Sequence, residues 1–186
     1  MKDKTAWRKI GMSAREALNE AVSRRFSEKI ALTLIKYPAV ASARTILSYY
    51  PLKGEVDARF FNEYALQAGK TLAFPICQAN GEMIAAIPDS PDDMEKGELG
   101  VKSPVKDRST IIAPTDIDVA VTPCVAFSAR DKTRLGRGGG YYDRYLPLCG
   151  NAVKIAIAYE VQRADDLPRD EWDAPLDVII TEAAVY

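Results

Sequence analysis

The stretch from residue 45 to residue 76 reads TILSYYPLKGEVDARFFNEYALQAGKTLAFPI, and it decides the fold class. The apolar, β-branched run Thr45–Tyr50 predicts a strand, and Thr71–Ile76 predicts a second one. Between them, Asp57 can cap a helix that ends at Gly69. The residues expected on the inner face of this helix are Phe61, Tyr64, Ala65 and Ala68.

Further apolar runs continue the alternation of strands and helices. They predict strands at Met83–Ile87, Ile117–Val121, Val153–Ala158 and Asp177–Thr181. Residues 88–116 are rich in proline, glycine and charge, so we expect a long excursion there. Most of the strands are continuously apolar, which is typical of a buried, mainly parallel sheet with helices on both faces. The predicted fold class is α/β: a single-domain, three-layer α/β/α sandwich with a mainly parallel central sheet, over residues 1–186.

The N-terminal segment predicts two helices. The first is expected over Lys4–Ile10 and to stop at Gly11. Ser13 and Glu16 have the spacing of a capping box, so the second helix is expected to begin at Ser13 and to end near Tyr37-Pro38. Its expected inner face consists of Leu18, Val22, Phe26, Ile30 and Leu34.

Composition excludes several classes of protein and of site. The net charge of −1 argues against nucleic-acid binding, and no apolar run approaches the ~20 residues of a membrane-spanning helix. The first residues are charged, so we expect a cytoplasmic protein without a signal segment. The chain has no histidine, which excludes histidine-based triads and metal ligands. Three widely spaced cysteines argue against a disulfide framework or zinc site. A metal would therefore be held by oxygen atoms, and Mg²⁺ is expected.

One glycine-rich stretch is suited to binding phosphates. It reads Thr133-Arg134-Leu135-Gly136-Arg137-Gly138-Gly139-Gly140-Tyr141-Tyr142-Asp143-Arg144-Tyr145-Leu146. The glycines let backbone N–H groups approach an anion, the arginines suit phosphate oxygens, and Asp143 can hold a hydrated Mg²⁺. We expect this loop to follow a longer loop from the Ile117–Val121 strand and to open a short helix.

Two standard nucleotide motifs are excluded in this loop. A Walker loop would end in Gly-Lys-Ser/Thr, but Gly140 is followed by Tyr141. A dinucleotide fingerprint would need glycine at Tyr141, and the expected strand ends about fifteen residues before Gly136. Nucleotide binding of another type remains.

Two adjoining motifs give the chain a family resemblance: Pro123-x-x-Ala126-Phe127 and Arg134-Leu135-Gly136-x-Gly138-x-Gly140-Tyr141-Tyr142-Asp143-Arg144. They resemble the 5-formyltetrahydrofolate cyclo-ligase family, also called 5,10-methenyltetrahydrofolate synthetase. Other segments resemble the same family, from one end of the chain to the other. They are Lys4-x-x-x-Arg8, Tyr49-Tyr50-Pro51, Glu55-Val56-Asp57, Ala158-Tyr159-Glu160-x-Gln162, Leu167-Pro168, Asp173-x-x-x-Asp177 and Thr181-Glu182.

The resemblance implies an ATP-dependent conversion of 5-formyltetrahydrofolate, in free or polyglutamylated form, to 5,10-methenyltetrahydrofolate, with release of ADP and phosphate. It implies Mg²⁺ as cofactor and ATP as co-substrate, and we expect a monomer. Arg134 and Arg137 are the expected catalytic residues, and Asp143 and Asp173 the expected metal ligands. The implied ATP-binding residues are Lys4, Arg8, Arg134, Leu135, Gly136, Arg137, Gly138, Gly139, Gly140, Tyr141 and Tyr142. The implied folate-binding residues are Tyr50, Glu55, Arg137, Gly138, Gly139, Gly140 and Tyr141.

The chain departs from the family pattern at two positions. Ser128 stands where the family usually has an acidic residue, and Ser103 stands where it usually has glutamate. These departures leave open an alternative, a non-catalytic paralogue that binds folate or nucleotide. A sugar-phosphate isomerase or CoA-transferase-like protein is a third reading, against which the Tyr141-Tyr142-Asp143 extension argues.

Overall fold

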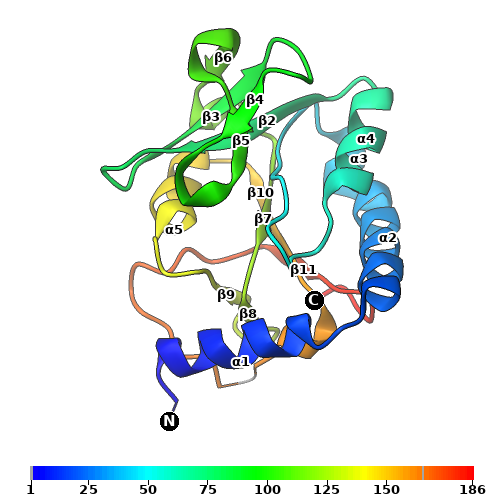
Figure 1. Ribbon diagram of the computed structural model, residues 1–186, viewed down its shortest axis with the longest axis vertical. Helices are drawn as coiled ribbons and strands as arrows, with labels where there is room; N and C mark the ends of the chain where they lie inside the picture. Colours follow the sequence, from blue (N-terminus) through cyan, green and yellow to red (C-terminus); the bar gives the residue numbers. More distant parts are fainter. Residues whose placement is uncertain (1, 165) are drawn as a thin grey trace.

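The computed structural model describes residues 2–164 and 166–186, which fold around a seven-stranded sheet. The order across the sheet is β11-β10-β7-β1-β2-β3-β6. The strands from β11 to β2 run parallel, whereas β3 and β6 pair antiparallel at one side (Figure 1). Their bounds are β1 Thr45–Leu47, β2 Thr71–Cys77, β3 Met83–Pro88, β6 Ser109–Ile112, β7 Val119–Pro123, β10 Val153–Ile157 and β11 Val178–Ile180. The predicted, mainly parallel central sheet is confirmed.

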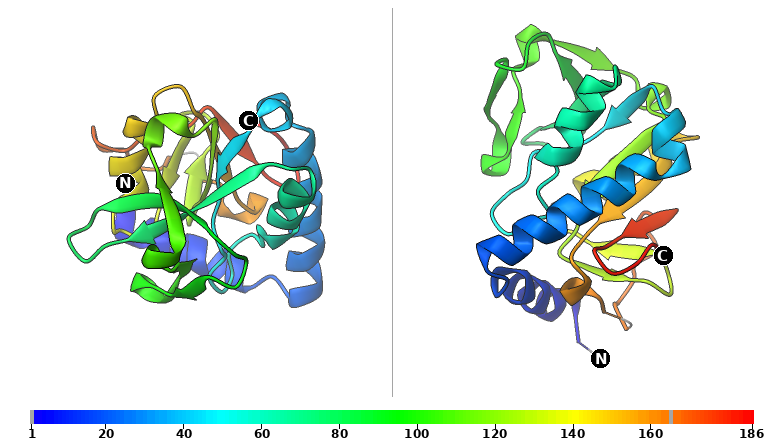
Figure 2. Two further views of the ribbon diagram at one scale, coloured as in Figure 1. Left: turned by 90° about the horizontal axis from the view of Figure 1, so that it is seen from above. Right: turned by 90° about the vertical axis from the view of Figure 1, so that its right-hand side faces the viewer.

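Helices cover both faces of this sheet, as predicted. One face is covered by α2 (Glu20–Lys36), α3 (Pro38–Ser42) and α4 (Arg59–Gln67), as Figure 2 shows. The opposite face is covered by the shorter α5 (Tyr141–Tyr145) and the 3₁₀ helix η4 (Leu146–Cys149), which pack on apolar residues of β1, β2 and β7. The second helical layer is therefore the thinner one.

Helix α1 (Lys4–Glu16) lies across the carboxyl edge of the sheet and corrects two predictions. Gly11 does not end the helix but lies buried inside it, where an added Cβ would stand 2.2 Å from the carbonyl oxygen of Val125. Ser13 belongs to the same helix, so it is not an N-cap. Asn19 caps α2 instead, accepting a 2.9 Å hydrogen bond from the Val22 N–H. Gly11 is therefore needed for the close packing of α1 on Val125 rather than for a turn.

The predicted inner face of the second helix is confirmed only in part. Ile30 and Leu34 are fully buried, and Phe26 packs against the same core. Leu18 also packs there but lies before α2, and Val22 is only half-buried. The chain leaves α2 at Tyr37, directly before the proline that begins α3.

The face of α4 was predicted only in part. Phe61 and Ala65 are buried, but Tyr64 is 43% exposed and Ala68 also faces solvent. The buried face instead runs through Ala58, Phe61, Asn62 and Ala65, the i, i+3, i+4, i+7 pattern. Gly69 follows the helix at a φ of +74°, as predicted.

Asp57 does not take the predicted N-cap position of α4. The N-cap residue is Ala58, which has no side-chain oxygen to offer. Asp57 instead accepts a 3.1 Å hydrogen bond from the Arg59 N–H and forms an ion pair with the Arg59 guanidinium. The Asp57 carboxylate thus lies one residue before the N-cap position of α4.

Two hairpins lie in segments that were predicted as loops. In the excursion of residues 88–116, β4 (Met94–Lys96) pairs antiparallel with β5 (Lys102–Pro104), and β6 joins the edge of the main sheet. After β7, β8 (Ala126–Ser128) pairs antiparallel with β9 (Thr133–Leu135). Short 3₁₀ helices fill other connections: η1 Glu98–Gly100, η2 Lys106–Arg108, η3 Pro114–Asp116 and η5 Glu160–Gln162. No helix among the described residues has both the length and the apolar content needed to cross a membrane.

Candidate functional site

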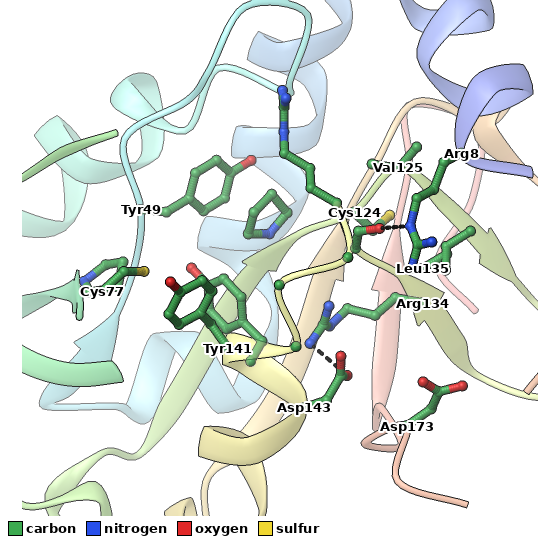
Figure 3. A pocket seen from close by; sticks show the side chains of 18 of the residues that line it. Arg8, Tyr49, Cys77, Cys124, Val125, Arg134, Leu135, Tyr141, Asp143 and Asp173 are labelled. Carbon is green, nitrogen blue, oxygen red and sulfur yellow. Dashed lines mark hydrogen bonds and ion pairs between the residues drawn. The ribbon is translucent and has the colours of Figure 1, made fainter. Parts of the chain in front are cut away.

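A cavity of about 640 Å³ opens at the carboxyl edge of the sheet, beside α1. Its walls come from α1, the segments after β1 and β7, the end of β2, the loop between β9 and α5, and residues 170–173. Every residue predicted to bind ATP, folate or a metal lines this cavity. Figure 3 labels Arg8, Arg134, Leu135, Tyr141, Asp143 and Asp173 among them. The structure therefore brings together segments from the beginning, middle and end of the chain, where open α/β sheets place their ligands.

The glycine-rich loop begins directly after β9. This strand was missed in the sequence, and it corrects the expectation that the nearest strand ends far before Gly136. The dinucleotide fingerprint still fails, because Tyr141 occupies the position of its third glycine. Gly138 has a φ of +110° and Gly140 one of +67°, a region that side-chain-bearing residues rarely adopt.

Arginines from two elements hold the loop in place. The Nε of Arg8 donates a 3.0 Å hydrogen bond to the Gly136 carbonyl. Arg144 donates to the carbonyl of Gly139 at 2.7 Å and to that of Gly81. The loop is thus anchored at both ends by side chains, while the backbone around Gly138 faces the cavity.

Arg134 is a buried cation in the cavity wall. Its side chain is 2% exposed, and its Nη2 lies 3.1 Å from Oδ1 of Asp143. The guanidinium also lies over the ring of Tyr142, at 5.2 Å from the centroid. The Nε of Arg134 is buried and has no hydrogen-bond partner among the described residues. A buried cationic donor without a partner is suited to an anionic ligand.

Lys4 is held by two carboxylates of the 170–173 turn. Its Nζ lies 2.6 Å from Oδ2 of Asp173 and 2.7 Å from Oδ2 of Asp170. Burial opposes the charge of Lys4, but hydrogen bonds and charges of Asp170 and Asp173 outweigh it and raise the pKa of Lys4. The lysine predicted for ATP and the aspartate predicted for the metal are therefore direct partners.

Glu55 lies between two arginines, one of which, Arg137, belongs to the glycine loop. Its Oε1 is 3.2 Å from Nε of Arg137 and 3.9 Å from Nη1 of Arg15. Its Oε2 accepts a 3.0 Å hydrogen bond from the Leu52 N–H, and its side chain is only 6% exposed. Arg15 is fully buried, and this burial lowers its pKa. The sequence gave no sign of this arginine, because it lies in the segment expected to begin the second helix.

Aromatic residues line the same end of the cavity. The ring of Tyr50 packs on Phe74 at a centroid distance of 4.9 Å and lies under Nζ of Lys102 at 4.8 Å. Burial raises the pKa of Tyr50 and that of Tyr142, so both phenols stay neutral at physiological pH. Tyr141 donates a 3.2 Å hydrogen bond to the Gln78 carbonyl.

The two cysteines in the cavity wall are weak nucleophiles. Burial raises the pKa of Cys124 to about 12 and raises that of Cys77 above its usual range. Both are free thiols. A covalent thiolate step has no candidate here.

Several lining residues were not predicted from the sequence. Arg144, Asp170 and Trp172 adjoin predicted residues, so their place in the chain was a usable signal. Pro75, Cys77 and Val101 gave none, because apolar residues in a strand or loop look alike whether they line a cavity or fill a core.

The carboxylates that reach the cavity fit a magnesium ion bound to phosphates. Among the described residues, no three histidine, cysteine or acidic side chains form a group able to hold a metal alone. Asp143 and Asp173 both line the cavity, and each is paired with a cation. Mg²⁺ is commonly bound by one or two carboxylates together with water and substrate phosphates, so two hard oxygen donors suffice.

The chain matches relatives of one kind over nearly its whole length. The family model for the 5-formyltetrahydrofolate cyclo-ligase family matches residues 1–182. A 5-formyltetrahydrofolate cyclo-ligase of Escherichia coli is 28% identical over 176 residues, covering 92% of this chain and 96% of the relative. The Mycoplasma pneumoniae cyclo-ligase is 32% identical over 186 residues, covering 97% and 99%.

Solved structures agree with these relatives. A 5,10-methenyltetrahydrofolate synthetase from Mycoplasma pneumoniae superposes with a TM-score of 0.80 at 31% identity, covering 97% of this chain and 99% of that one. The NMR structure of the Aquifex aeolicus enzyme of the same name gives a TM-score of 0.85 at 35% identity, covering 98% and 91%. The predicted resemblance is confirmed: the chain belongs to the 5-formyltetrahydrofolate cyclo-ligase family.

Proposed function

We propose that this chain converts 5-formyltetrahydrofolate to 5,10-methenyltetrahydrofolate at the expense of ATP, as one cyclo-ligase domain spanning residues 1–186. One observation carries the proposal: the residues assigned to nucleotide, metal and folate from separate motifs line a single cavity. The family membership and the names of its relatives support the same reaction.

The reaction needs activation of an unreactive carbon. The formyl group on N5 is an amide, and its carbon is a poor electrophile. Transfer of the γ-phosphoryl group to the formyl oxygen gives an iminium phosphate and ADP. N10 then attacks the carbon and loses its proton, and the formyl oxygen leaves with the phosphoryl group as inorganic phosphate, which takes up that proton. Phosphoryl transfer needs positioning and charge neutralisation rather than a protein nucleophile, which suits a site without histidine.

On the nucleotide side, backbone N–H groups of the glycine loop approach the triphosphate, and Arg134 neutralises it from the buried wall. Lys4 and Arg8 lie one helical turn apart on α1 and face the same cavity. Arg137, exposed at the cavity mouth, is free to turn from Glu55 toward the transferred phosphoryl group. We assign Arg134 and Arg137 as the catalytic residues.

On the folate side, Glu55 accepts hydrogen bonds from the N–H groups of the pterin ring. Both its oxygens have an acceptor position left beyond the Arg137 and Leu52 contacts. Tyr50 provides a ring face in the same wall. The glycine loop lies between this end and the phosphates, so the formyl oxygen and the γ-phosphate meet beside Gly138 and Tyr141.

Asp143 and Asp173 would hold Mg²⁺ in this site. When bound, the ion would neutralise phosphate charge and orient the triphosphate. To bind the ion, the Asp143 carboxylate must contact it beside its present partner Arg134, and the Asp173 carboxylate must do so beside Lys4.

The positions of Ser103 and Ser128 weaken the alternative of a non-catalytic paralogue. Ser103 is buried in β5, and the Ser128 hydroxyl bonds Asp131 at the end of the β8–β9 hairpin. Neither serine lines the cavity. The two departures from the family pattern therefore lie outside the walls that would contact either substrate.

The decisive experiment is an absorbance assay in the near ultraviolet, where 5,10-methenyltetrahydrofolate absorbs. We expect product from 5-formyltetrahydrofolate only when ATP and Mg²⁺ are both present, and none after chelation by EDTA. Binding of both substrates in calorimetry without any absorbance would support the non-catalytic paralogue. A monomeric state, a cytoplasmic location and binding of polyglutamylated substrate stay predictions.

A further inference from the structure

Trp172 is an exposed aromatic side chain at the mouth of the cavity. It is 73% exposed, yet it is among the lining residues together with Asp170 and Asp173. The chain has two tryptophans, and the other, Trp7, is 9% exposed and packed against Ala126, Leu135, Ala164 and Leu167. Within the described part of the chain, no other ring or cation stacks on the Trp172 indole. What distinguishes this exposed ring from other exposed apolar side chains is its place among the cavity-lining residues, where an aromatic face offers a large contact area to a ligand.

The backbone that carries Trp172 is fixed although its ring is in solvent. Asp170 and Asp173 close a turn around it, with a 3.1 Å bond from the Asp173 N–H to the Asp170 carbonyl. The Asp173 carboxylate accepts a 2.7 Å hydrogen bond from the Asp170 N–H, and both carboxylates form ion pairs with Lys4. Ala174, directly after the turn, is buried. The indole is therefore placed by the same contacts that place the proposed metal and phosphate ligands.

The position of Trp172 favours the nucleotide over the folate. Figure 3 shows Tyr49 and Cys77 at one end of the cavity, Arg8 and Asp173 at the other, and Arg134 between them. When its phosphates are bound at the glycine loop, the rest of the nucleotide can extend in two directions. One is occupied by the folate, which must meet the γ-phosphate; the other leads past Lys4 and Asp173 to Trp172.

The charge of the residues around Trp172 also favours the nucleotide base over the folate. Lys4, Asp170 and Asp173 together carry one net negative charge, which opposes an acidic group such as a glutamyl tail. A neutral heteroaromatic ring meets no such penalty, and every purine offers a face for stacking.

We propose that Trp172 is the platform on which the purine ring of the nucleotide stacks. This inference rests on the proposed function, because it takes the nucleotide phosphates to lie at the glycine loop. It adds a binding contact for the base, for which the motif residues provide no aromatic partner at this end of the cavity.

The first test uses the fluorescence of the indole itself. In a Trp7→Phe variant, Trp172 is the remaining tryptophan, and ADP should shift its emission to shorter wavelength and protect it from acrylamide quenching. Inorganic tripolyphosphate, which has the charge but no base, should bind without either change. If Trp7→Phe does not fold, acrylamide quenching of the unmodified protein reports the same contact, because buried Trp7 is shielded.

The second test measures affinity. Trp172→Ala should weaken ADP binding about ten- to a hundredfold in calorimetry, from the ~1–3 kcal/mol of a base–aromatic stack. Trp172→Phe should restore most of the loss, and tripolyphosphate should bind all three proteins alike. The melting temperature should hardly change, because the ring is exposed.

The outcomes separate the two proposals. ADP that binds with unchanged Trp172 emission and unchanged affinity in Trp172→Ala overturns the platform but leaves the proposed function intact. Equal losses for ADP and tripolyphosphate would also overturn it, by showing that Trp172 only supports the turn. If neither ADP nor ATP binds the unmodified protein, the proposed function fails and the platform fails with it.

Discussion

The guanidinium of Arg137 and the carboxylate of Glu55 meet at 3.2 Å, although the two residues lie 82 positions apart in the chain. Arg137 belongs to the glycine loop proposed for the phosphates, and Glu55 to the wall proposed for the pterin. This ion pair therefore joins the two halves of the site. Breaking this ion pair costs free energy. Once one ligand has broken it, the second ligand binds without that cost, so each substrate should strengthen the binding of the other.

Glu55→Gln should raise the KM for 5-formyltetrahydrofolate strongly and leave ATP binding close to its original value. The amide NH₂ replaces one acceptor oxygen and opposes the pterin N–H groups, whereas the remaining oxygen can still accept from Arg137. A lost charge-assisted bond costs ~1.5–3 kcal/mol, or about ten- to a hundredfold. Steady-state kinetics with each substrate varied would measure it, with Glu20→Gln as an exposed control. Loss of ATP affinity with an unchanged folate KM would mean that the two ends are reversed.

Gly138→Val should abolish ATP binding while the fold persists. The residue has a φ of +110°, and an added Cβ would stand 3.4 Å from Cζ of Arg8, in the loop proposed to bind the phosphates. Gly69→Val is the matched control, because Gly69 has a φ of +74° with nothing within 4 Å of its Cβ position. Both variants should lose stability, but only Gly138→Val should lose nucleotide in a calorimetric titration. Unchanged affinity in Gly138→Val would contradict the phosphate loop.

Arg8→Ala and Arg134→Ala should each weaken ATP more than folate, by about ten- to a hundredfold. The two variants should differ in stability. Arg134 is buried, and its removal takes away the cation that pairs with Asp143, whereas Arg8 is only half-buried. Urea unfolding and nucleotide titration would separate these effects, with exposed Lys9→Ala on the same helix as control. Equal loss of both ligands would show that these arginines are structural.

Lys4 predicts a loss of stability at high pH. Burial lowers the pKa of Lys4, but the hydrogen bonds and charges of Asp170 and Asp173 together raise it by more than burial lowers it. The folded pKa therefore lies above the ordinary value of 10.5. The stabilisation is therefore complete below that value and is lost as the pH rises through the folded pKa. The difference in unfolding free energy between the original protein and Lys4→Met should be constant from pH 7 to 9 and shrink above about 10.5. A difference independent of pH up to 11.5 would contradict the ion pairs.

Gly11→Ala should destabilise the protein, against the ordinary preference of helices for alanine. In an exposed helix this change gains about 1 kcal/mol, but here the new methyl would meet the Val125 carbonyl at 2.2 Å. Backbone on both sides must shift, which costs ~1–3 kcal/mol. Urea denaturation measures the sign, and a stabilised variant would show that α1 is free to move.

The sheet could be predicted from the sequence because burial on both faces leaves a continuous apolar run for each strand. The runs at Thr45, Thr71, Met83 and Val153 each became a strand. The β8–β9 hairpin could not be predicted, because its buried strand residues include the polar Ser128, Thr133 and Arg134, so no apolar run marks either strand. Its turn at Lys132 also lacks glycine, although the φ there is +48°.

The predicted bounds of the N-terminal helix were wrong for a different reason. Gly11 and Ser13 carry the local chemistry of a helix end and a helix start, and both lie inside α1. Tertiary packing on Val125 decided the outcome, and that contact is not encoded near Gly11 in the chain. The predicted site residues were found through motifs, and Trp172 adjoins one of them, whereas Arg15 belongs to no motif that was quoted and needed the structure.

Lys4 and Asp173 are 169 positions apart, and both are needed to complete one end of the cavity. During synthesis, the N-terminal helix therefore leaves the ribosome long before the carboxylates that will hold its lysine. This corner cannot close before residue 173 has been synthesised, and contacts of such long sequence separation form late. Nucleotide that binds only the closed corner would then draw the last step of folding to completion.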